Sequence, residues 1–523
     1  MVAARRDIRI LDCTLRDGGY INENTFGEEN IKSIIKSLKQ SRVDLIEYGY
    51  IEDKKPITKD KTEYKDFESL FKLTGLERGN ILMLLGEKYD VDKLPIAPND
   101  DCYLRISFHK KHAEAGIDKI RRIIEKGYKV FIQPTVTMSY TEDELVELLK
   151  ECNELRPVSV AIVDTFGQMT PEDVEEKAKI FDGVLDKDIA VSFHAHNNLQ
   201  NAYANAIRFI ESVNEKRKII VDTSIYGMGR GAGNLPTELI MGYLNQNFGR
   251  DYDVEPLLTI TDDVISRFKE KNNWGYSLPY YLSGIYGVHP SYILTFMERK
   301  TLNSRDIKQL VDMISDDKRS EFDLEYAKEL YNAYNNKIVD DEDSRKQLTK
   351  LIGGRKVLLL GPGKSIRENV DKIKNYIMKE KPFIIGINGE YELGPDAIFF
   401  SNKKRYENME LGSRKNTILT TSNIGGVKKG NLVFNYGTYL AKGCGVSDNA
   451  LLMLLNILKA VKVEKVTVAG FDGYDTKENF YKGSLELLLD KNYVDELNKV
   501  IKENITKLRD EMQIESITPS KNI

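Results

Sequence analysis

The sequence predicts an α/β protein with a (β/α)8 TIM barrel, then a helical region, then a separate Rossmann-like α/β domain. Eight short apolar runs alternate with amphipathic stretches over roughly the first 250 residues. Such alternation is typical of parallel strands joined by helices, and eight units in about 250 residues have the size of a closed barrel. We expect the barrel over residues 1–250, the helical extension over 251–350 and the second α/β domain over 351–523.

The barrel strands are expected where apolar and β-branched residues run between turn signals. Amphipathic patterns between these runs, such as Glu142–Leu155 and Pro171–Leu185, predict the connecting helices. The expected strands are Ile8–Thr14, Asp44–Tyr48, Asn80–Leu85, Cys102–Ser107, Lys129–Thr135, Ser159–Asp164, Ile189–Phe193 and Ile219–Thr223.

Beyond the barrel the pattern becomes helical and then returns to strands. From Glu255 onward, apolar residues recur at helical spacing, as in Leu302–Ile314 and Glu321–Ile338. A Gly353-Gly354 pair ends this region. An open α/β sheet is then predicted, with strands at Lys356–Leu360, Phe383–Ile387, Ala397–Phe400, Thr417–Thr421 and Lys465–Ala469.

The composition excludes several function classes. A formal net charge of −4 and a pI near 6.0 argue against a nucleic-acid binder, because contact with phosphates needs a basic face. The four cysteines lie far apart without a Cys-x-x-Cys pair, so neither a zinc ribbon nor a disulfide framework is predicted. Neither a signal peptide nor an apolar run long enough to span a bilayer is recognisable. We expect a cytoplasmic protein with no nucleic-acid partner and no membrane span.

Two short segments, far apart in the sequence, predict a metal site. Asp17 follows the first expected strand, and His194 and His196 lie at the end of the seventh. Alternate residues of a strand point the same way, so the two histidines can aim at one point. The active sites of barrels gather at the carboxyl ends of the strands, which brings Asp17 close to them. A mixed imidazole and carboxylate set suits Mn, Zn, Fe or Co better than Ca.

Five segments occur in the order and at the spacing of one enzyme family. Together they resemble the metal-dependent pyruvate aldolase and HMG-CoA lyase-like TIM-barrel enzymes, most nearly the 4-hydroxy-2-oxovalerate aldolases. The resemblance covers roughly the first 240 residues, and the combination is specific although no single segment is. The matching segments are Thr14-Leu15-Arg16-Asp17-Gly18, Ile46-Glu47, Asp164-Thr165-Phe166-Gly167, His194-Ala195-His196-Asn197-Asn198 and the glycine-rich Gly227–Asn234.

The resemblance implies a divalent metal held by Asp17, His194 and His196. Asn234 is either a fourth ligand, as in the lyase branch, or a residue that orients a ligand. We expect manganese, with magnesium, cobalt and zinc as alternatives. In these enzymes the metal chelates the carboxylate and keto oxygens of a 2-oxo acid and acts as a Lewis acid on the carbonyl.

The resemblance also implies roles for four other side chains. Arg16 is expected to stabilise the enolate oxygen as negative charge develops there. Glu47 is expected to pair with Arg16 and hold its plane. Thr165 is the first candidate for binding the pyruvate carboxylate, and Arg105, at the end of the fourth strand, is the second.

The chain departs from the aldolase pattern at the acid/base residue. Tyr20 stands where those aldolases have a histidine, three residues after the metal-binding aspartate. A tyrosine with an ordinary pKa near 10 is a poorer base at neutral pH than histidine. His289 aligns with an active-site tyrosine of the aldolases. We hypothesise that the two roles are exchanged, with His289 as base and Tyr20 as hydrogen-bond donor.

The C-terminal domain resembles the Rossmann-like domains of sialyltransferase-like and pterin-pyrophosphokinase-like proteins. A glycine-rich turn follows its first strand, and such a turn can cradle a phosphate at a helix N-terminus. The third glycine of a dinucleotide fingerprint and the full Walker spacing are missing. A plain tight turn and a capping aspartate are the alternatives to a nucleotide or nucleotide-sugar site. The candidate residues are Gly361, Gly363, Ser365 and Asp472.

Three function hypotheses follow. The first is a class II aldolase-like lyase acting on a 2-oxo acid and an aldehyde, with a place in sugar or surface-glycan (polysaccharide) metabolism. The second is an acyl-CoA condensing enzyme or lyase, although Gly229-Arg230-Gly231-Ala232 lacks the catalytic cysteine of the lyase branch. The third is a scaffold barrel joined to a nucleotide-sugar-binding domain. We expect a homo-oligomer in each case.

Overall fold

A computed structural model describes residues 6–52, 57–75, 81–86, 89–298, 302–409, 416–425, 430–441, 448–476 and 491–523. The chain forms two compact units: Met1–Ile293 with Asp316–Phe322, and Leu294–Ser315 with Asp323–Ile523. The expected helical segment 251–350 therefore contributes to both units instead of standing alone. None of the helices in the described part of the chain has the length and apolar character needed to cross a membrane.

The first unit is a closed parallel barrel. Strand β1 pairs with β9 on one side and with β2 on the other, which closes the ring. A two-residue strand, β3 (Glu63–Tyr64), adds to β2 outside the ring. The barrel strands are β1 (Ile8–Asp12), β2 (Leu45–Ile51), β4 (Ile81–Leu85), β5 (Cys102–Phe108), β6 (Lys129–Pro134), β7 (Ser159–Asp164), β8 (Ala190–Ala195) and β9 (Ile219–Thr223).

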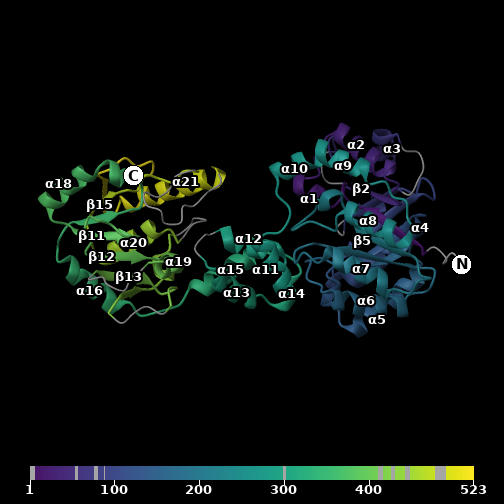
Figure 1. The fold of residues 1–523 in the computed structure, drawn as a ribbon. Coiled ribbons are helices and arrows are strands. Elements are labelled where there is room, and N and C mark those ends of the chain that lie inside the picture. The colour runs from purple at the N-terminus through teal and green to yellow at the C-terminus, as the bar shows by residue number, and fades with distance from the viewer. Residues whose placement is uncertain are drawn as a thin grey trace. The chain divides into compact units, whose positions relative to one another are not determined.

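Helices connect and cover these strands; in Figure 1, α5, α6 and α7 lie along the outer side of the strands. Capping boxes fix two helix starts, at Thr141 with Glu144 for α5 and at Thr170 with Asp173 for α6. The connecting helices are α1 (Gly19–Asn22), α2 (Glu28–Gln40), α3 (Phe67–Thr74), α4 (Ala113–Glu125), α5 (Glu142–Leu155), α6 (Pro171–Val184), α7 (Ala202–Ser212) and α8 (Thr237–Phe248).

The inside of the barrel is filled, not hollow. A small apolar cluster draws Leu11, Leu45, Phe131, Ala190 and Ile220 from five different strands. Because side chains of five strands can meet only in the interior, this cluster plugs the barrel. The larger apolar core lies between the strands and the surrounding helices. The charged groups at the mouth therefore lie above a packed apolar interior.

A further helical segment of this unit packs against the loops at the barrel mouth. Trp274 Nε1 donates to the Tyr226 carbonyl at 3.2 Å. Gly284 of α11 lies against Leu199, so closely that a Cβ there would be 3.0 Å from the leucine side chain. This packing brings His289 to the mouth. The helices of this unit after the barrel are α9 (Glu255–Ile260), α10 (Ser266–Lys271), α11 (Leu278–Tyr286) and α14 (Asp316–Arg319), and the boundary between the two units falls within α12 (Pro290–Glu298).

The second unit is a seven-stranded parallel sheet in the order β14-β13-β12-β11-β10-β15-β16. In Figure 1, β11, β12 and β13 lie side by side. The strands are β10 (Val357–Leu360), β11 (Phe383–Ile387), β12 (Ala397–Phe400), β13 (Thr417–Thr421), β14 (Leu432–Phe434), β15 (Lys465–Ala469) and β16 (Gln513–Ser516).

Helices bury both faces of this sheet, which explains the continuous apolar runs of its strands. Val357 and Leu359 pack with α16, α20 and α21, whereas Leu358 and Leu360 pack on the opposite face, with α18. The helices of the unit are α13 (Ser304–Asp312), α15 (Leu324–Asn335), α16 (Glu342–Ile352), α17 (Ser365–Glu368), α18 (Val370–Glu380), α19 (Lys403–Glu407), α20 (Ala450–Ala460) and α21 (Lys491–Leu508).

The predicted fold class, a TIM barrel with helices and a separate parallel α/β sheet, is confirmed. The expected first residue of the third barrel strand, Asn80, lies outside the described residues, as does Cys444. Among the described residues Cys13, Cys102 and Cys152 are free thiols. The strands β3 and β14 were not predicted because two or three residues are too few to show a period. The strand β16, Gln-Ile-Glu-Ser, was not predicted because it has a single apolar residue.

Candidate active site

Asp17, His194 and His196 come together at the barrel mouth. One carboxylate oxygen and one ring nitrogen from each histidine lie within 4.8 Å of one another. Asp17 Oδ2 is 3.9 Å from His194 Nε2 and 4.0 Å from His196 Nε2. All three side chains are buried. This is the donor set and spacing that a divalent transition metal needs.

The other ring nitrogen of each histidine is held by the protein. His194 Nδ1 is 3.0 Å from Asp222 Oδ2, and His196 Nδ1 is 3.2 Å from the Arg230 carbonyl oxygen. Each acceptor favours a proton on Nδ1 and so leaves the lone pair of Nε2 directed at the common centre. The ring orientations are therefore fixed in the form that binds a metal.

Asn234 lies at the same centre. Its Nδ2 donates to Asp17 Oδ2, while its Oδ1 is buried and has no hydrogen-bond partner among the described residues. A buried amide oxygen without a partner is costly and calls for an explanation. A Cβ at Gly229 would overlap this amide and lie 3.1 Å from Asp17 Oδ2, so glycine is required there. The orphaned oxygen fits a metal ligand or a ligand-orienting group.

A buried chain of charges supports the centre. Arg16 donates to Asp17 at 3.0 Å and to Glu47 at 2.9 Å. Arg105 donates to the same Glu47 oxygen at 2.7 Å and also pairs with Asp222. Two guanidinium groups thus face three carboxylates, which leaves one uncompensated negative charge in a dry site. A divalent cation fits both this charge and the ligand set.

The ionisation of the centre follows from this network. Burial opposes the charge of Asp17, but Arg16, the two histidines and Asn234 outweigh it and hold its pKa well below the usual range. Burial lowers the pKa of His196 to about 4, with Asp17 opposing that shift. For Arg16, burial is outweighed by Glu47 and Asp17, which raise its pKa. Around neutral pH the carboxylate is charged and the imidazole of His196 is neutral, as metal binding requires.

Arg105 does not lie where a substrate ligand is expected. It is 1% exposed, and its guanidinium is occupied by Glu47 and Asp222 inside the barrel. The prediction that it binds the pyruvate carboxylate is corrected, because a side chain enclosed by two carboxylates has no access to a ligand at the mouth. Its contacts instead fix the two carboxylates of Glu47 and Asp222. Glu47 in turn orients Arg16, and Asp222 orients His194.

Thr165 follows β7 at the mouth and is half-buried. Its Oγ1 accepts a hydrogen bond from the Val136 amide at 2.7 Å, and its hydroxyl proton can still be donated to a ligand. The preceding residue, Asp164, is buried and accepts from the amides of Gln168 and Met169. Burial raises the pKa of Asp164 to about 7.

Tyr20 and His289 meet around a third residue, Arg230. The Arg230 guanidinium lies 5.7 Å from the centre of the Tyr20 ring and contacts His289 Nε2. Tyr20 is 54% exposed, while burial, Arg230 and His109 lower the pKa of His289 to about 3. His289 is thus unprotonated at neutral pH, as a base must be, but a pKa this low makes it a weak base.

Sequence reasoning missed Asp222 and did not single out Arg230. Asp222 is a charged residue within the apolar strand β9, and a charge in a strand buried on both faces is a signal that could have found it. Arg230 is a cation inside a glycine-rich loop at a strand end. No signal in the sequence shows that it reaches Tyr20 and His289.

The glycine-rich turn of the second unit is closed on the protein itself. The amides of Gly361 and Gly363 donate to the carbonyls of Ala469 and Gly470, each at 2.8 Å. Asp472 accepts from the Ser365 amide at 2.9 Å and from its hydroxyl. The predicted phosphate cradle is therefore corrected: the Asp472 carboxylate lies where a phosphate would, and a Cβ at Gly363 would overlap it.

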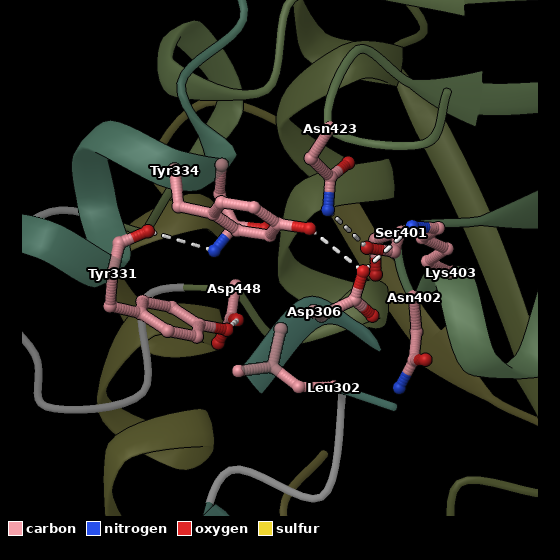
Figure 2. A pocket seen from close by; sticks show the side chains of 10 residues that line it. Leu302, Asp306, Tyr331, Tyr334, Ser401, Asn402, Lys403, Asn423 and Asp448 are labelled. Atoms are coloured by element: carbon pink, nitrogen blue, oxygen red, sulfur yellow. Dashed lines mark hydrogen bonds and ion pairs between the residues drawn. The ribbon is translucent and has the colours of Figure 1, made fainter. Parts of the chain in front are cut away.

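A pocket of the second unit lies beyond the ends of β12 and β13 (Figure 2). Its acidic groups are paired: Asp306 accepts from Lys403 at 2.6 Å and from Tyr334 at 2.8 Å, and Asp448 accepts from Tyr331 at 2.6 Å. The dashed lines of Figure 2 mark bonds among the lining groups, such as those from Tyr334 to Asp306 and from Asn423 to Ser401. This network joins α13 and α15 to the sheet.

Comparisons with known proteins bear on the first unit. The sequence profile of the HMGL-like family matches residues 103–264. The 4-hydroxy-2-oxovalerate aldolase of Carboxydothermus hydrogenoformans is 26% identical over 322 residues, 58% of this chain and 90% of that enzyme. The oxaloacetate decarboxylase of Mycobacterium tuberculosis is 25% identical over 249 residues, 47% of this chain and 72% of that enzyme.

Among solved structures, the N-terminal domain of a putative aldolase from Bacteroides vulgatus is 27% identical, with a TM-score of 0.49. The match covers 58% of this chain and 99% of that domain. The resemblance of residues 351–523 to sialyltransferase-like and pterin-pyrophosphokinase-like domains stays a prediction. For the barrel unit the predicted resemblance is confirmed: residues 103–264 match the HMGL-like profile, and the unit is similar to the 4-hydroxy-2-oxovalerate aldolases.

Proposed function

We propose that the barrel unit makes or breaks a carbon–carbon bond next to the enolate carbon of a 2-oxo acid, with pyruvate as the enolate donor. The observation that carries the proposal is the set of buried lone pairs at the mouth: two Nε2 atoms and one carboxylate oxygen within 4.8 Å, beside the orphaned Asn234 Oδ1. The 2-oxo acids named in the relatives' activities agree with it.

Asp17, His194 and His196 would hold the metal, with Asn234 as fourth ligand or as the group that orients Asp17. We propose manganese, because imidazole and carboxylate donors together suit it better than calcium. A divalent ion here would supply a Lewis acid for the keto oxygen of the substrate.

Arg16 would stabilise the negative charge that develops on the enolate oxygen. The Arg16 guanidinium donates to Glu47 through Nε and to Asp17 through Nη1. These two bonds orient Arg16 before the substrate binds. Such preorganised donors need no rearrangement during the reaction. Thr165 would donate its hydroxyl to the carboxylate of the 2-oxo acid, because that hydroxyl lies at the end of the adjacent strand.

We keep His289 and Tyr20 as the proposed proton-transfer pair, since both lie at the mouth beside Arg230. The neutral state of His289 supports this role, while its low pKa predicts that a bound substrate must offset the charge of Arg230 for efficient proton transfer. A His289→Ala variant that keeps full activity would remove His289 from the mechanism.

The test is proton exchange at the methyl group of pyruvate in heavy water, followed by NMR with Mn²⁺-loaded protein. We expect exchange in the wild type and its loss in Asp17→Asn, whereas Asp118→Asn, on the outer helix α4, exchanges normally. Absence of exchange with every divalent metal would contradict pyruvate as the donor. Consumption of an acyl-CoA thioester would then indicate the condensing-enzyme alternative.

For the second unit we propose binding of a nucleotide or nucleotide-sugar, which would place the protein in sugar or surface-glycan metabolism. Its support is the open parallel sheet, because such sheets bind ligands outside the carboxyl ends of their strands. The turn after β10, which Asp472 closes, would not itself hold the phosphate. Saturation-transfer NMR with UDP-sugars tests this, and no transfer to any of them would contradict it.

A further inference from the structure

Arg230 is a cation at the barrel mouth that has no negative partner in the described part of the chain. Its guanidinium contacts one neutral ring nitrogen, His289 Nε2, and one ring face, that of Tyr20. No carboxylate forms an ion pair with it among the residues that the structure describes. By contrast, Arg16 and Arg105 each pair with two carboxylates. Burying half of an unpaired guanidinium costs free energy unless a ligand supplies the opposite charge.

The position of Arg230 connects it to the proposed metal centre. Its carbonyl oxygen accepts from His196 Nδ1 at 3.2 Å, so its backbone adjoins a proposed ligand. Its guanidinium lies over Tyr20, three residues after Asp17. On the other side, the His289 ring lies edge-on to Phe166, 6.4 Å between centroids, and Phe166 follows Thr165. The guanidinium is thus between the two segments that would bind the 2-oxo acid.

We propose that Arg230 binds a second carboxylate of the substrate, on the fragment that becomes the aldehyde. This inference rests on the proposed function and specifies its substrate class: aldol adducts of pyruvate with a carboxylate-bearing aldehyde. A single planar guanidinium matches one carboxylate through two parallel N–H···O bonds. The first carboxylate and the keto oxygen would remain with Thr165 and with the metal that Asp17, His194 and His196 would hold.

The chemistry favours an aldol adduct over a decarboxylation substrate. In retro-aldol cleavage the C4 hydroxyl loses its proton to a base, the C3–C4 bond breaks, and its electron pair forms the enolate, which is then protonated at C3 to give pyruvate. The C5 carboxylate keeps its charge throughout, so its contact with Arg230 persists. In decarboxylation the distal carboxylate leaves as neutral CO2, and a guanidinium bound to it would stabilise the starting state.

Two unreactive ligands of equal chain length provide the test. 2-Oxoglutarate carries a carboxylate at C5, whereas 2-oxovalerate carries a methyl group there. Titration calorimetry of the Mn²⁺-loaded full chain is expected to show 2-oxoglutarate binding about 10- to 100-fold more tightly, the range for a hydrogen bond to a charged group. In Arg230→Met the ratio should fall to about one, and in Arg230→Gln it should fall similarly.

The matched control is Arg121→Met, an exposed arginine on α4 that should keep the wild-type ratio. A wild-type ratio near one, or an unchanged ratio in both Arg230 variants, would overturn the inference. Pyruvate proton exchange is measured on the same preparation. Exchange without a carboxylate preference would overturn only the role of Arg230, whereas neither exchange nor binding would overturn the proposed function as well.

Discussion

The barrel mouth and the glycine-rich turn of the second unit both combine carboxylates with tight turns, but their polar atoms differ. At the mouth, Asn234 Oδ1 is buried with no partner among the described residues, and two Nε2 atoms face Asp17. In the turn, Asp472 receives both the amide and the hydroxyl of Ser365. A ligand site is therefore indicated by polar groups that are held in place yet unsatisfied, and not by residue types alone.

The largest effect is expected at Arg16. Arg16→Lys should lower the rate of pyruvate proton exchange by about 10²- to 10³-fold, because an ammonium cannot contact Glu47, Asp17 and an enolate oxygen in one plane. NMR measures the rate. Mn²⁺ titration of the same variant serves as the control, since metal binding should persist. A rate within a few-fold of the wild type would contradict the role given to Arg16.

Asp222→Asn tests whether metal binding depends on the carboxylate that holds His194 Nδ1. We expect metal affinity to fall about 10- to 100-fold, as is usual when the partner of a ligating histidine is lost. Removing one partner of the buried Arg105 pair should also lower the free energy of unfolding by about 3–5 kcal/mol. Mn²⁺ titration and urea unfolding measure both. Asp188→Asn, at an exposed position, is the control. Equal Mn²⁺ affinities of Asp222→Asn and the wild type would contradict the role given to Asp222.

The second unit should respond differently. Asp472→Ala removes the acceptor of the Ser365 amide and hydroxyl, so the free energy of unfolding should fall by about 0.5–2 kcal/mol, the usual range for a lost cap. Pyruvate exchange by the barrel should be unchanged. Urea unfolding measures the loss. A stabilised variant that gains phosphate binding would show that the turn is a ligand site after all.

The smallest effect is a pH dependence from Asp164. Burial raises its pKa from 3.8 to about 7, so the folded protein holds a proton that the unfolded chain releases. Stability should therefore decline as pH rises from about 4 to about 7 and stay at the lower level above that. Asp164→Asn should flatten this slope in urea unfolding of metal-free protein. Part of the slope would remain, because burial also raises the pKa of Asp12, to about 6. An unchanged slope would contradict this assignment.

The proposed metal ligands could be predicted from sequence because barrel topology gathers the carboxyl ends of strands. That rule places Asp17 near His194 and His196 without any knowledge of side-chain contacts. It fails for Arg105, because a position near a strand end does not reveal that Glu47 and Asp222 already enclose the guanidinium. Asp222 itself lies in the apolar strand β9, where its charge was a signal left unused.

The prediction of a phosphate site at the glycine-rich turn was wrong for a different reason. A turn that cradles phosphate and a turn closed by a carboxylate have the same local sequence, and Asp472 comes from more than 100 residues away. Only the parallel pairing of β10 with β15 brings it there. The meeting of Tyr20, Arg230 and His289 likewise depends on how the segment after the barrel packs on the mouth.

The most direct test of the central claim, that the barrel mouth holds a divalent ion, is a count of Mn²⁺ bound per chain. Titration followed by electron paramagnetic resonance should show one tightly bound ion in the wild-type full chain. Asp17→Asn and the double variant His194→Ala with His196→Ala should lose it while remaining folded by circular dichroism. A tight Mn²⁺ ion that persists in both variants, or is absent from the wild type, would contradict the account.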